Sequence, residues 1–164
     1  MKKRKNWIGR LETKIKGEDL SKKYKQLYKK DLESANVLIE NGLYNQAAYF
    51  LIQTIEKMLR SKIFSKVNGD IEYYREKNRS HNISDGIEFL VDVTGFDDLA
   101  KEDLKNQLNN TVLETEIISR LNNNLRYPIY SKKYESYSLL ILTVKDTDRL
   151  LLMVNKLESY LEGM

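Results

Sequence analysis

The chain has 164 residues, a length typical of one domain built around one hydrophobic core. It contains no cysteine, which excludes disulfides, thiolate metal sites and a cysteine nucleophile, and suggests a reducing, cytoplasmic setting. The longest apolar runs, 139–142 and 150–154, are far shorter than the roughly 20 residues of a transmembrane helix. The basic N-terminus lacks the apolar stretch of a secretory signal, so we expect a cytoplasmic protein with no transmembrane segment.

The positive charge is concentrated at the N-terminus. Residues 1–16 carry seven Lys or Arg against one Glu, whereas the rest of the chain is slightly acidic. One helical face of this arm carries Trp7, Ile8, Leu11 and Ile15, which predicts a short amphipathic helix. The arm could dock on the body of the domain as a solubilising segment, or it could contact a membrane surface, a partner helix or nucleic acid. The candidate phosphate contacts are Lys2, Lys3, Arg4 and Lys5.

Two apolar stripes joined at Asn41 and Gly42 predict a helical hairpin within residues 31–64. Gly42 can adopt the positive φ that ends a helix. The first helix is predicted from about 18 to 40, after a break at Gly17, with the stripe Leu20, Tyr24, Leu27, Asp31, Ala35 and Leu38. The second helix has the stripe Ala48, Leu51, Ile55, Met58 and Leu59. Two helices cannot bury both stripes, so the later chain must supply more.

Three further helices are predicted after a loop at 67–80. Asn82 is a candidate N-cap for a short third helix that ends near Gly95. The fourth runs from about 99 to 125, with the apolar residues Leu104, Leu108, Val112, Leu113, Ile117, Leu121 and Leu125. It ends at Pro128, which removes a backbone donor and restricts Tyr127.

The fifth helix is predicted from a Ser131 cap to about Glu162. Its stripe contains Tyr137, Leu140, Ile141, Val144, Leu151, Val154, Leu157 and Leu161. Further apolar residues on its other sides indicate a central position or a second buried face in a homodimer. The sequence therefore predicts an all-α, up-and-down bundle of about five helices over residues 17–164, behind a basic arm or helix over 1–16.

Arg126 is the strongest single candidate for a phosphate contact. Its guanidinium can bind phosphate in a fork, and aromatic and cationic residues follow closely in the sequence. These neighbours are Tyr127, Tyr130, Lys132 and Lys133. The alternative is that Arg126 bonds the last carbonyls of the fourth helix while the tyrosines pack against the fifth. The carboxylate pairs Asp97/Asp98 and Asp146/Asp148 lack a third ligand, so no metal site is predicted, and no cofactor motif is present.

The order of these features resembles the HEPN domain, an all-α family, over roughly residues 20–161. The resembling residues are 34–36, 42–50, Gln53, 56–59, 81–83 and 126–128. The resemblance implies a helical bundle that dimerises, and either a metal-independent ribonuclease or a nucleic-acid-binding module. It also implies a prokaryotic defence or toxin–antitoxin setting, often with a nucleotidyltransferase partner.

Catalytic members of this family carry an Arg followed after four to six residues by a His, late in the bundle. Arg126 stands at the expected place, but no His follows it before the fifth helix. Arg75 and His81, the only histidine, match the spacing by count but lie between the second and third helices. His81 could act in proton transfer, or it could cap or orient the third helix.

We therefore predict a HEPN-like module that binds RNA, a nucleotide or a protein partner and lacks the usual nuclease pair. The first alternative is a metal-independent ribonuclease that uses Arg126 or the pair Arg75 and His81. The second alternative is a structural helical adaptor.

Overall fold

The computed structural model of the protein describes residues 15–164. The basic arm predicted to contact phosphate through Lys2, Lys3, Arg4 and Lys5 lies outside these described residues. The described part contains seven α-helices, a short 3-10 turn, a π-helical turn and one two-stranded hairpin, which confirms the all-α prediction. Within residues 15–164, no helix is both long and apolar enough to cross a membrane.

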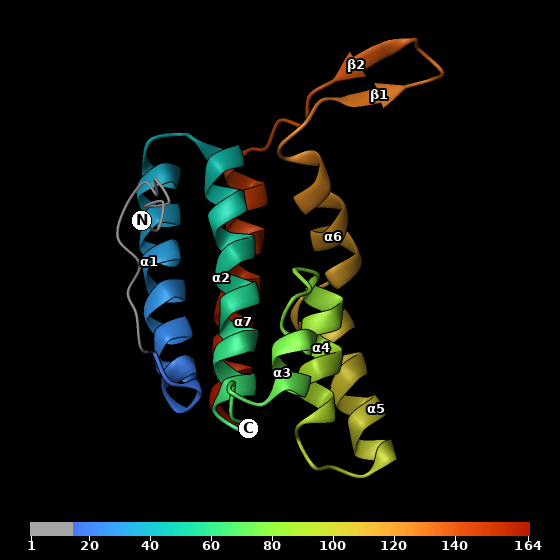
Figure 1. Ribbon diagram of the computed structural model, residues 1–164. Coiled ribbons are helices and arrows are strands. Elements are labelled where there is room, and N and C mark those ends of the chain that lie inside the picture. The colour runs from blue at the N-terminus through green and yellow to red at the C-terminus, as the bar shows by residue number, and fades with distance from the viewer. Residues whose placement is uncertain (1–14) are drawn as a thin grey trace, which may run out of the picture.

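The first two long helices form the predicted antiparallel pair (Figure 1). A 3-10 turn, η1 (Gly17–Asp19), leads into α1 (Leu20–Glu40), and α2 (Tyr44–Phe64) returns beside it. Gly42 has a φ of 72° in the connection, as predicted. The predicted stripe of α2 is confirmed, since each of its members is at most 3% exposed.

The buried face of α1 differs from the predicted stripe. Leu27 is 46% exposed, while Tyr28 is only 8% exposed and Ala35 is fully buried. Tyr24, Tyr28 and Leu32 follow one another at intervals of four residues, and this row packs toward the core. The prediction chose Leu27 because it is apolar, but packing places the larger tyrosine ring inside.

Gly17 holds the beginning of the described chain against the loop before α3. Its amide nitrogen donates to Asp70 Oδ2 at 3.1 Å. A Cβ atom at this position would lie 2.3 Å from the backbone nitrogen of Asp70, so only glycine allows this close approach. The break predicted at Gly17 is therefore a tight contact with a distant loop.

Helix α2 occupies the centre of the fold, where it contacts α1 on one side and α4, α6 and α7 on others (Figure 1). The remaining helices are α3 (Glu72–Lys77), α4 (Ile83–Asp92), α5 (Asp98–Asn106), α6 (Thr115–Asn124) and α7 (Val144–Glu162). Helix α7 buries one face but leaves Leu152 54% exposed. The central position predicted for the last helix therefore belongs to α2.

The predicted fourth helix is interrupted. After α5 the chain forms a π-helical turn, η2 (Gln107–Val112), and Glu114 then adopts a φ of 47° before α6 begins. The sequence at the interruption contains Asn109, Asn110 and Thr111, which are poor helix formers. The break changes which side of the helix faces inward, so Ile118 is buried in place of the predicted Ile117.

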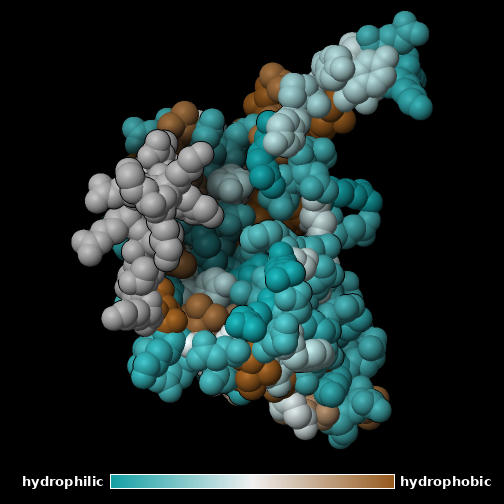
Figure 2. Space-filling model, in the orientation of Figure 1, coloured by the Kyte–Doolittle hydropathy of each residue, from teal (hydrophilic) through white to brown (hydrophobic). Residues whose placement is uncertain are grey.

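The predicted fifth helix begins twelve residues too early, since its observed cap is Thr143. Ser131 belongs to a strand and caps no helix, because β1 (Ile129–Ser131) and β2 (Ser136–Ser138) form an antiparallel hairpin with Tyr130 opposite Tyr137. This hairpin projects from the end of the bundle (Figure 1). Figure 2 shows apolar side chains at its base, where Leu139 and Ile141 are 70% and 80% exposed. The exposed apolar residues that favoured a homodimer therefore lie mainly on extended chain, whereas Leu152 lies on α7.

The extended chain after the hairpin is tied to α2 by one side chain. Asn45 Nδ2 donates to the Leu140 carbonyl oxygen at 2.6 Å, and the Leu142 amide donates to Asn45 Oδ1 at 2.9 Å.

We expect Asn45→Ala to lower the free energy of unfolding by about 1–3 kcal/mol, because two partly buried backbone groups lose their partners. Asn45→Asp keeps the acceptor for the Leu142 amide but sets a carboxylate oxygen against the Leu140 carbonyl oxygen, so it should not restore the lost stability. Hydrogen exchange provides the check: the Leu142 amide should lose protection in Asn45→Ala, and unchanged protection would refute this role.

A capping box fixes the start of α7. The backbone and hydroxyl of Thr143 both donate to Asp146 Oδ2 at 2.7 Å. These hydrogen bonds, from the Thr143 side chain first and its backbone second, lower the pKa of Asp146. A carboxyl with a lowered folded-state pKa contributes stability above its unfolded pKa, and this contribution is lost as the pH falls through the folded pKa.

We therefore expect Asp146→Asn to lower the free energy of unfolding by about 0.5–1 kcal/mol near neutral pH. The exposed position of Asp146 keeps this effect small. The difference from the wild type should vanish in acid, where the wild-type carboxyl is also uncharged. Urea unfolding at both pH values measures it, with Asp148→Asn as the control outside the capping box. A difference that persists in acid would show that charge is not the cause.

Candidate nucleic-acid interface

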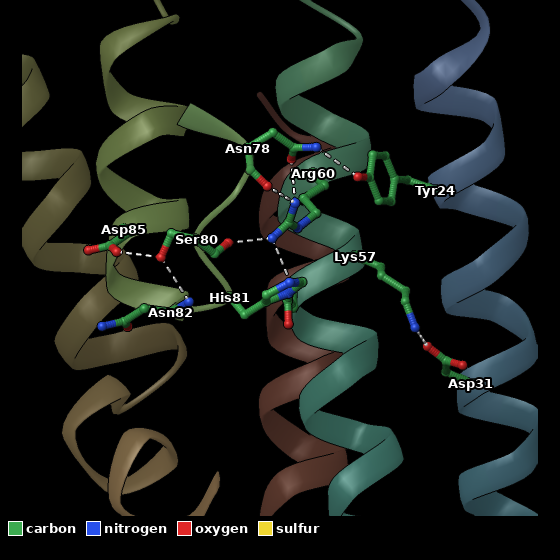
Figure 3. Close-up of polar contacts among 10 residues, drawn as sticks. Tyr24, Asp31, Lys57, Arg60, Asn78, Ser80, His81, Asn82 and Asp85 are labelled. Carbon is green, nitrogen blue, oxygen red and sulfur yellow. Dashed lines mark hydrogen bonds and ion pairs between the residues drawn. The ribbon is translucent and has the colours of Figure 1, made fainter. Parts of the chain in front are cut away.

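The segment between α3 and α4 is fastened to the central helix by Arg60. This side chain is only 7% exposed. Its Nη1 donates to the Asn78 carbonyl at 2.6 Å, and its Nη2 donates to Glu56 Oε1 at 2.8 Å and to the Ser80 carbonyl (Figure 3). Asn78 Nδ2 in turn donates to the Tyr24 hydroxyl on α1 at 2.9 Å. The segment that carries His81 is therefore rigidly placed.

His81 is oriented by a buried carboxylate. Its Nδ1 lies 2.9 Å from Glu56 Oε1, and Glu56 is 7% exposed whereas the His81 side chain is 81% exposed. An ionised carboxylate only accepts hydrogen bonds, so Nδ1 carries the hydrogen and Nε2 of the neutral ring is an acceptor. The cap of α4 is Asn82, as predicted, since its Oδ1 accepts from the Ser84 amide at 2.9 Å. His81 therefore has a different role from capping.

Arg126 and His81 line the same surface cavity. The cavity measures about 390 Å³ and lies between the start of α4 and the end of α6. Its lining residues are Ser80, His81, Asn82, Ile83, Ile118, Ser119, Asn122, Asn123 and Arg126. Asn122 Oδ1 is buried and has no partner among the described residues. The cavity is thus rich in hydroxyl and amide groups, with one cation and one imidazole.

An aromatic ring holds the guanidinium of Arg126. Its carbon Cζ lies 5.6 Å from the centroid of the Tyr49 ring on α2, a distance suited to a cation–π contact. Within residues 15–164, no carboxylate is paired with Arg126 and no hydrogen bond joins it to the last carbonyls of α6. The alternative in which Arg126 closes that helix is therefore wrong, and its fork remains available to an anion.

The family model of the HEPN domain matches residues 22–163 of the chain. The chain belongs to the HEPN domain family. No curated protein and no solved structure matches it. The predicted resemblance is thereby confirmed over most of the chain, and the basic residues 1–16 lie outside the match.

The other predicted site residues of this HEPN domain lie on two segments. Arg75 is exposed in the last turn of α3, a short helix within the predicted loop, and is not among the residues that line the cavity. Tyr127 and Tyr130 are 69% and 51% exposed at the start of the hairpin. Lys132 and Lys133 are exposed in its turn. These tyrosines do not pack against α7, as the alternative proposed, but face solvent.

Sequence reasoning missed the pair Glu56 and Arg60. A charged pair four residues apart, within the apolar stripe of a central helix, was the available signal. Charged side chains at buried positions almost always have partners, so this pair could have indicated a buried polar network. Which loop the network would hold could not be deduced, because Asn78, Ser80 and His81 reach it only through the tertiary fold.

Proposed function

We propose that this HEPN domain binds single-stranded RNA and that Arg126 holds a backbone phosphate at the edge of the polar cavity. The observation that carries the proposal is the position of Arg126. Its guanidinium is exposed, free of a carboxylate partner within residues 15–164, and located beside hydroxyl and amide groups that can bond ribose and phosphate. An Arg fork binds phosphate with charge-assisted hydrogen bonds, which are the stronger class.

The hairpin extends the same surface. Tyr127 and Tyr130 are exposed and can stack with bases, and Lys132 and Lys133 add positive charge for the backbone. Family membership supports a prokaryotic defence or toxin–antitoxin setting, with a homodimer and a nucleotidyltransferase-type partner, as part of this proposal. The basic residues 1–16 would contribute further, less specific, phosphate contacts.

The test compares Arg126→Ala with Arg120→Ala. Arg120 is an exposed arginine on α6, the helix that precedes Arg126, and is paired with Glu116, so both variants lose the same charge. We expect Arg126→Ala to weaken binding of a labelled single-stranded RNA about tenfold or more, because a hydrogen bond to a charged group contributes about 1.5–3 kcal/mol. The slope of the logarithm of the binding constant against the logarithm of the salt concentration should also become shallower by about one, because one phosphate contact is lost. Fluorescence anisotropy across a salt series measures both quantities.

The matched control decides between a site and a general electrostatic effect. If the two variants bind RNA equally well, Arg126 holds no phosphate and the proposal is wrong. A structural adaptor predicts no salt-dependent RNA binding by any variant. Deletion of residues 1–16 should weaken binding but preserve the difference between the two arginine variants.

A second candidate function is metal-independent cleavage of RNA. It is favoured by one observation: His81, oriented by Glu56, lines the same cavity as Arg126. Nε2 of His81 would accept the proton of an RNA 2′-hydroxyl, whose oxygen then attacks the adjacent phosphorus and displaces the 5′-oxygen, which leaves as a hydroxyl with a proton taken from water. Arg126 would stabilise the negative charge on the phosphoryl oxygens. The pair Arg75 and His81 lacks this shared cavity.

A further inference from the structure

Arg126 lines two cavities of different character. One is the polar cavity that contains His81. The other is a cleft of about 270 Å³ between the start of α2 and the end of α6, lined by Asn45, Gln46, Tyr49, Phe50, Leu125 and Arg126. Aromatic and aliphatic side chains form most of this cleft. The proposed phosphate contact therefore lies at the edge of an apolar recess.

We propose that this cleft is a nucleobase subsite, which takes one base of the RNA strand whose phosphate Arg126 holds. The inference rests on the proposed function and extends it to the base. Single-stranded RNA is commonly held by stacking of its bases on aromatic rings or guanidinium planes, with cations on the backbone. Tyr49 and Phe50 provide aromatic rings in this cleft, and Arg126 provides the cation.

The aromatic groups of the cleft are already ordered. The rings of Tyr49 and Phe50 meet edge to face, with centroids 5.7 Å apart and an interplanar angle of 80°. The guanidinium of Arg126 lies 5.6 Å from the Tyr49 centroid. A base that enters would therefore meet preformed surfaces, and little side-chain freedom would be lost on binding.

The charge at the edge of the cleft favours a nucleotide over other apolar ligands. An aliphatic or aromatic peptide side chain would fill the recess but would leave Arg126 without an anion. A nucleotide carries a flat apolar ring and a phosphate one sugar apart, which matches a recess with a cation at its rim. The cleft is smaller than the about 300–1,000 Å³ of typical drug-sized ligand sites, so its volume suits a single ring system.

Two side-chain amides at the cleft, those of Asn45 and Gln46, differ in the hydrogen bonds they already form. Asn45 is held in place by its hydrogen bonds to the backbone of Leu140 and Leu142, which engage one of its N–H groups and its carbonyl oxygen. Gln46 is exposed and forms no hydrogen bond within the described residues, so its amide is available to the edge of the base. Beyond Arg126, the strand would continue into the polar cavity, where Ser119 and Asn123 can bond ribose and phosphate.

The experiment is an abasic scan. A short labelled single-stranded oligoribonucleotide is compared with copies in which one base at a time is removed while ribose and phosphate stay. We expect one position at which base removal weakens binding to the full chain at least about fivefold, as befits the loss of one stacked base. Equal affinity for all copies, with Arg126→Ala still weaker than Arg120→Ala, would overturn the subsite and leave the proposed function standing.

Tyr49→Leu identifies the cleft as the location of that base. The variant should bind the intact oligonucleotide about fivefold more weakly and should be insensitive to removal of the base at the identified position. If Tyr49→Leu also weakens binding of the abasic copy by the same factor, it acts through Arg126 and the subsite is refuted. Tyr73→Leu is the control, because Tyr73 is 59% exposed on α3 and remote from the cleft residues in the sequence. A wild-type protein that does not bind single-stranded RNA would instead refute the proposed function.

Discussion

Arg60→Met is expected to lower the free energy of unfolding by about 3–5 kcal/mol, the usual cost of removing one partner from a buried ion pair. The substitution keeps most of the side-chain volume but removes the guanidinium. Glu56 would then be a buried carboxylate whose only remaining partner within residues 15–164 is His81, and the carbonyls of Asn78 and Ser80 would lose their donors. Urea unfolding followed by circular dichroism measures the loss.

Arg79→Met is the matched control for burial. Arg79 also pairs with a glutamate, Glu76, at 2.8 Å, but the two side chains are 76% and 52% exposed. Exposed pairs contribute little, so this variant should stay within about 0.5 kcal/mol of the wild type. If Arg60→Met were equally mild, the Arg60 network would not stabilise the fold. The double variant Glu56→Met with Arg60→Met should recover part of the loss, since no lone charge stays buried.

His81→Ala carries the largest expected effect on activity. If the second candidate function holds, the wild type cleaves labelled single-stranded RNA in the presence of EDTA, and removal of the general base slows cleavage about 10²–10⁴-fold. Arg126→Ala should slow it as well, whereas Arg75→Ala should not, because Arg75 does not line the cavity. The measurement is product formation with time, at saturating protein. An inactive wild type, or activity that EDTA abolishes, would rule out this mechanism.

Glu56→Gln tests whether Glu56 positions His81. The amide oxygen can still accept a hydrogen bond from Nδ1, but the negative charge beside the imidazole is lost. Cleavage should therefore slow, since the imidazolium that forms when His81 takes up the proton loses a stabilising carboxylate. A carboxylate with only a structural role would change the stability and leave the cleavage rate unchanged.

Local sequence signals predicted the elements that local physics determines. Gly42 at a helix end, Asn82 as an N-cap and the stripe of α2 each depend on neighbouring residues in the chain, and each is confirmed. The start of α7 was also encoded locally, because Thr143 and Asp146 have capping-box spacing. The prediction overlooked it because the apolar residues before Thr143 happen to continue a helical period.

The hairpin shows where periodicity misleads. Residues 129–138 contain both an alternating pattern, with Tyr130 and Tyr137 facing each other, and apolar residues at helical spacing. The first pattern prevailed in the structure, since aromatic and β-branched residues favour strands. The site was predictable only in part: Arg126 could be chosen by its chemistry, but its neighbour in the cavity, His81, is brought there by packing of α4 against α2 and α6.

The close contact between Gly17 and the Asp70 loop has a practical consequence for any attached partner. It fixes the point at which residues 1–16 join the bundle, at the end opposite the hairpin, and α7 also finishes at that end (Figure 1). Since α7 has 19 residues, this end lies roughly 28 Å from the start of α7 beside the hairpin. A tag, a surface linkage or a fused protein at the C-terminus would therefore leave the proposed RNA-binding face unobstructed.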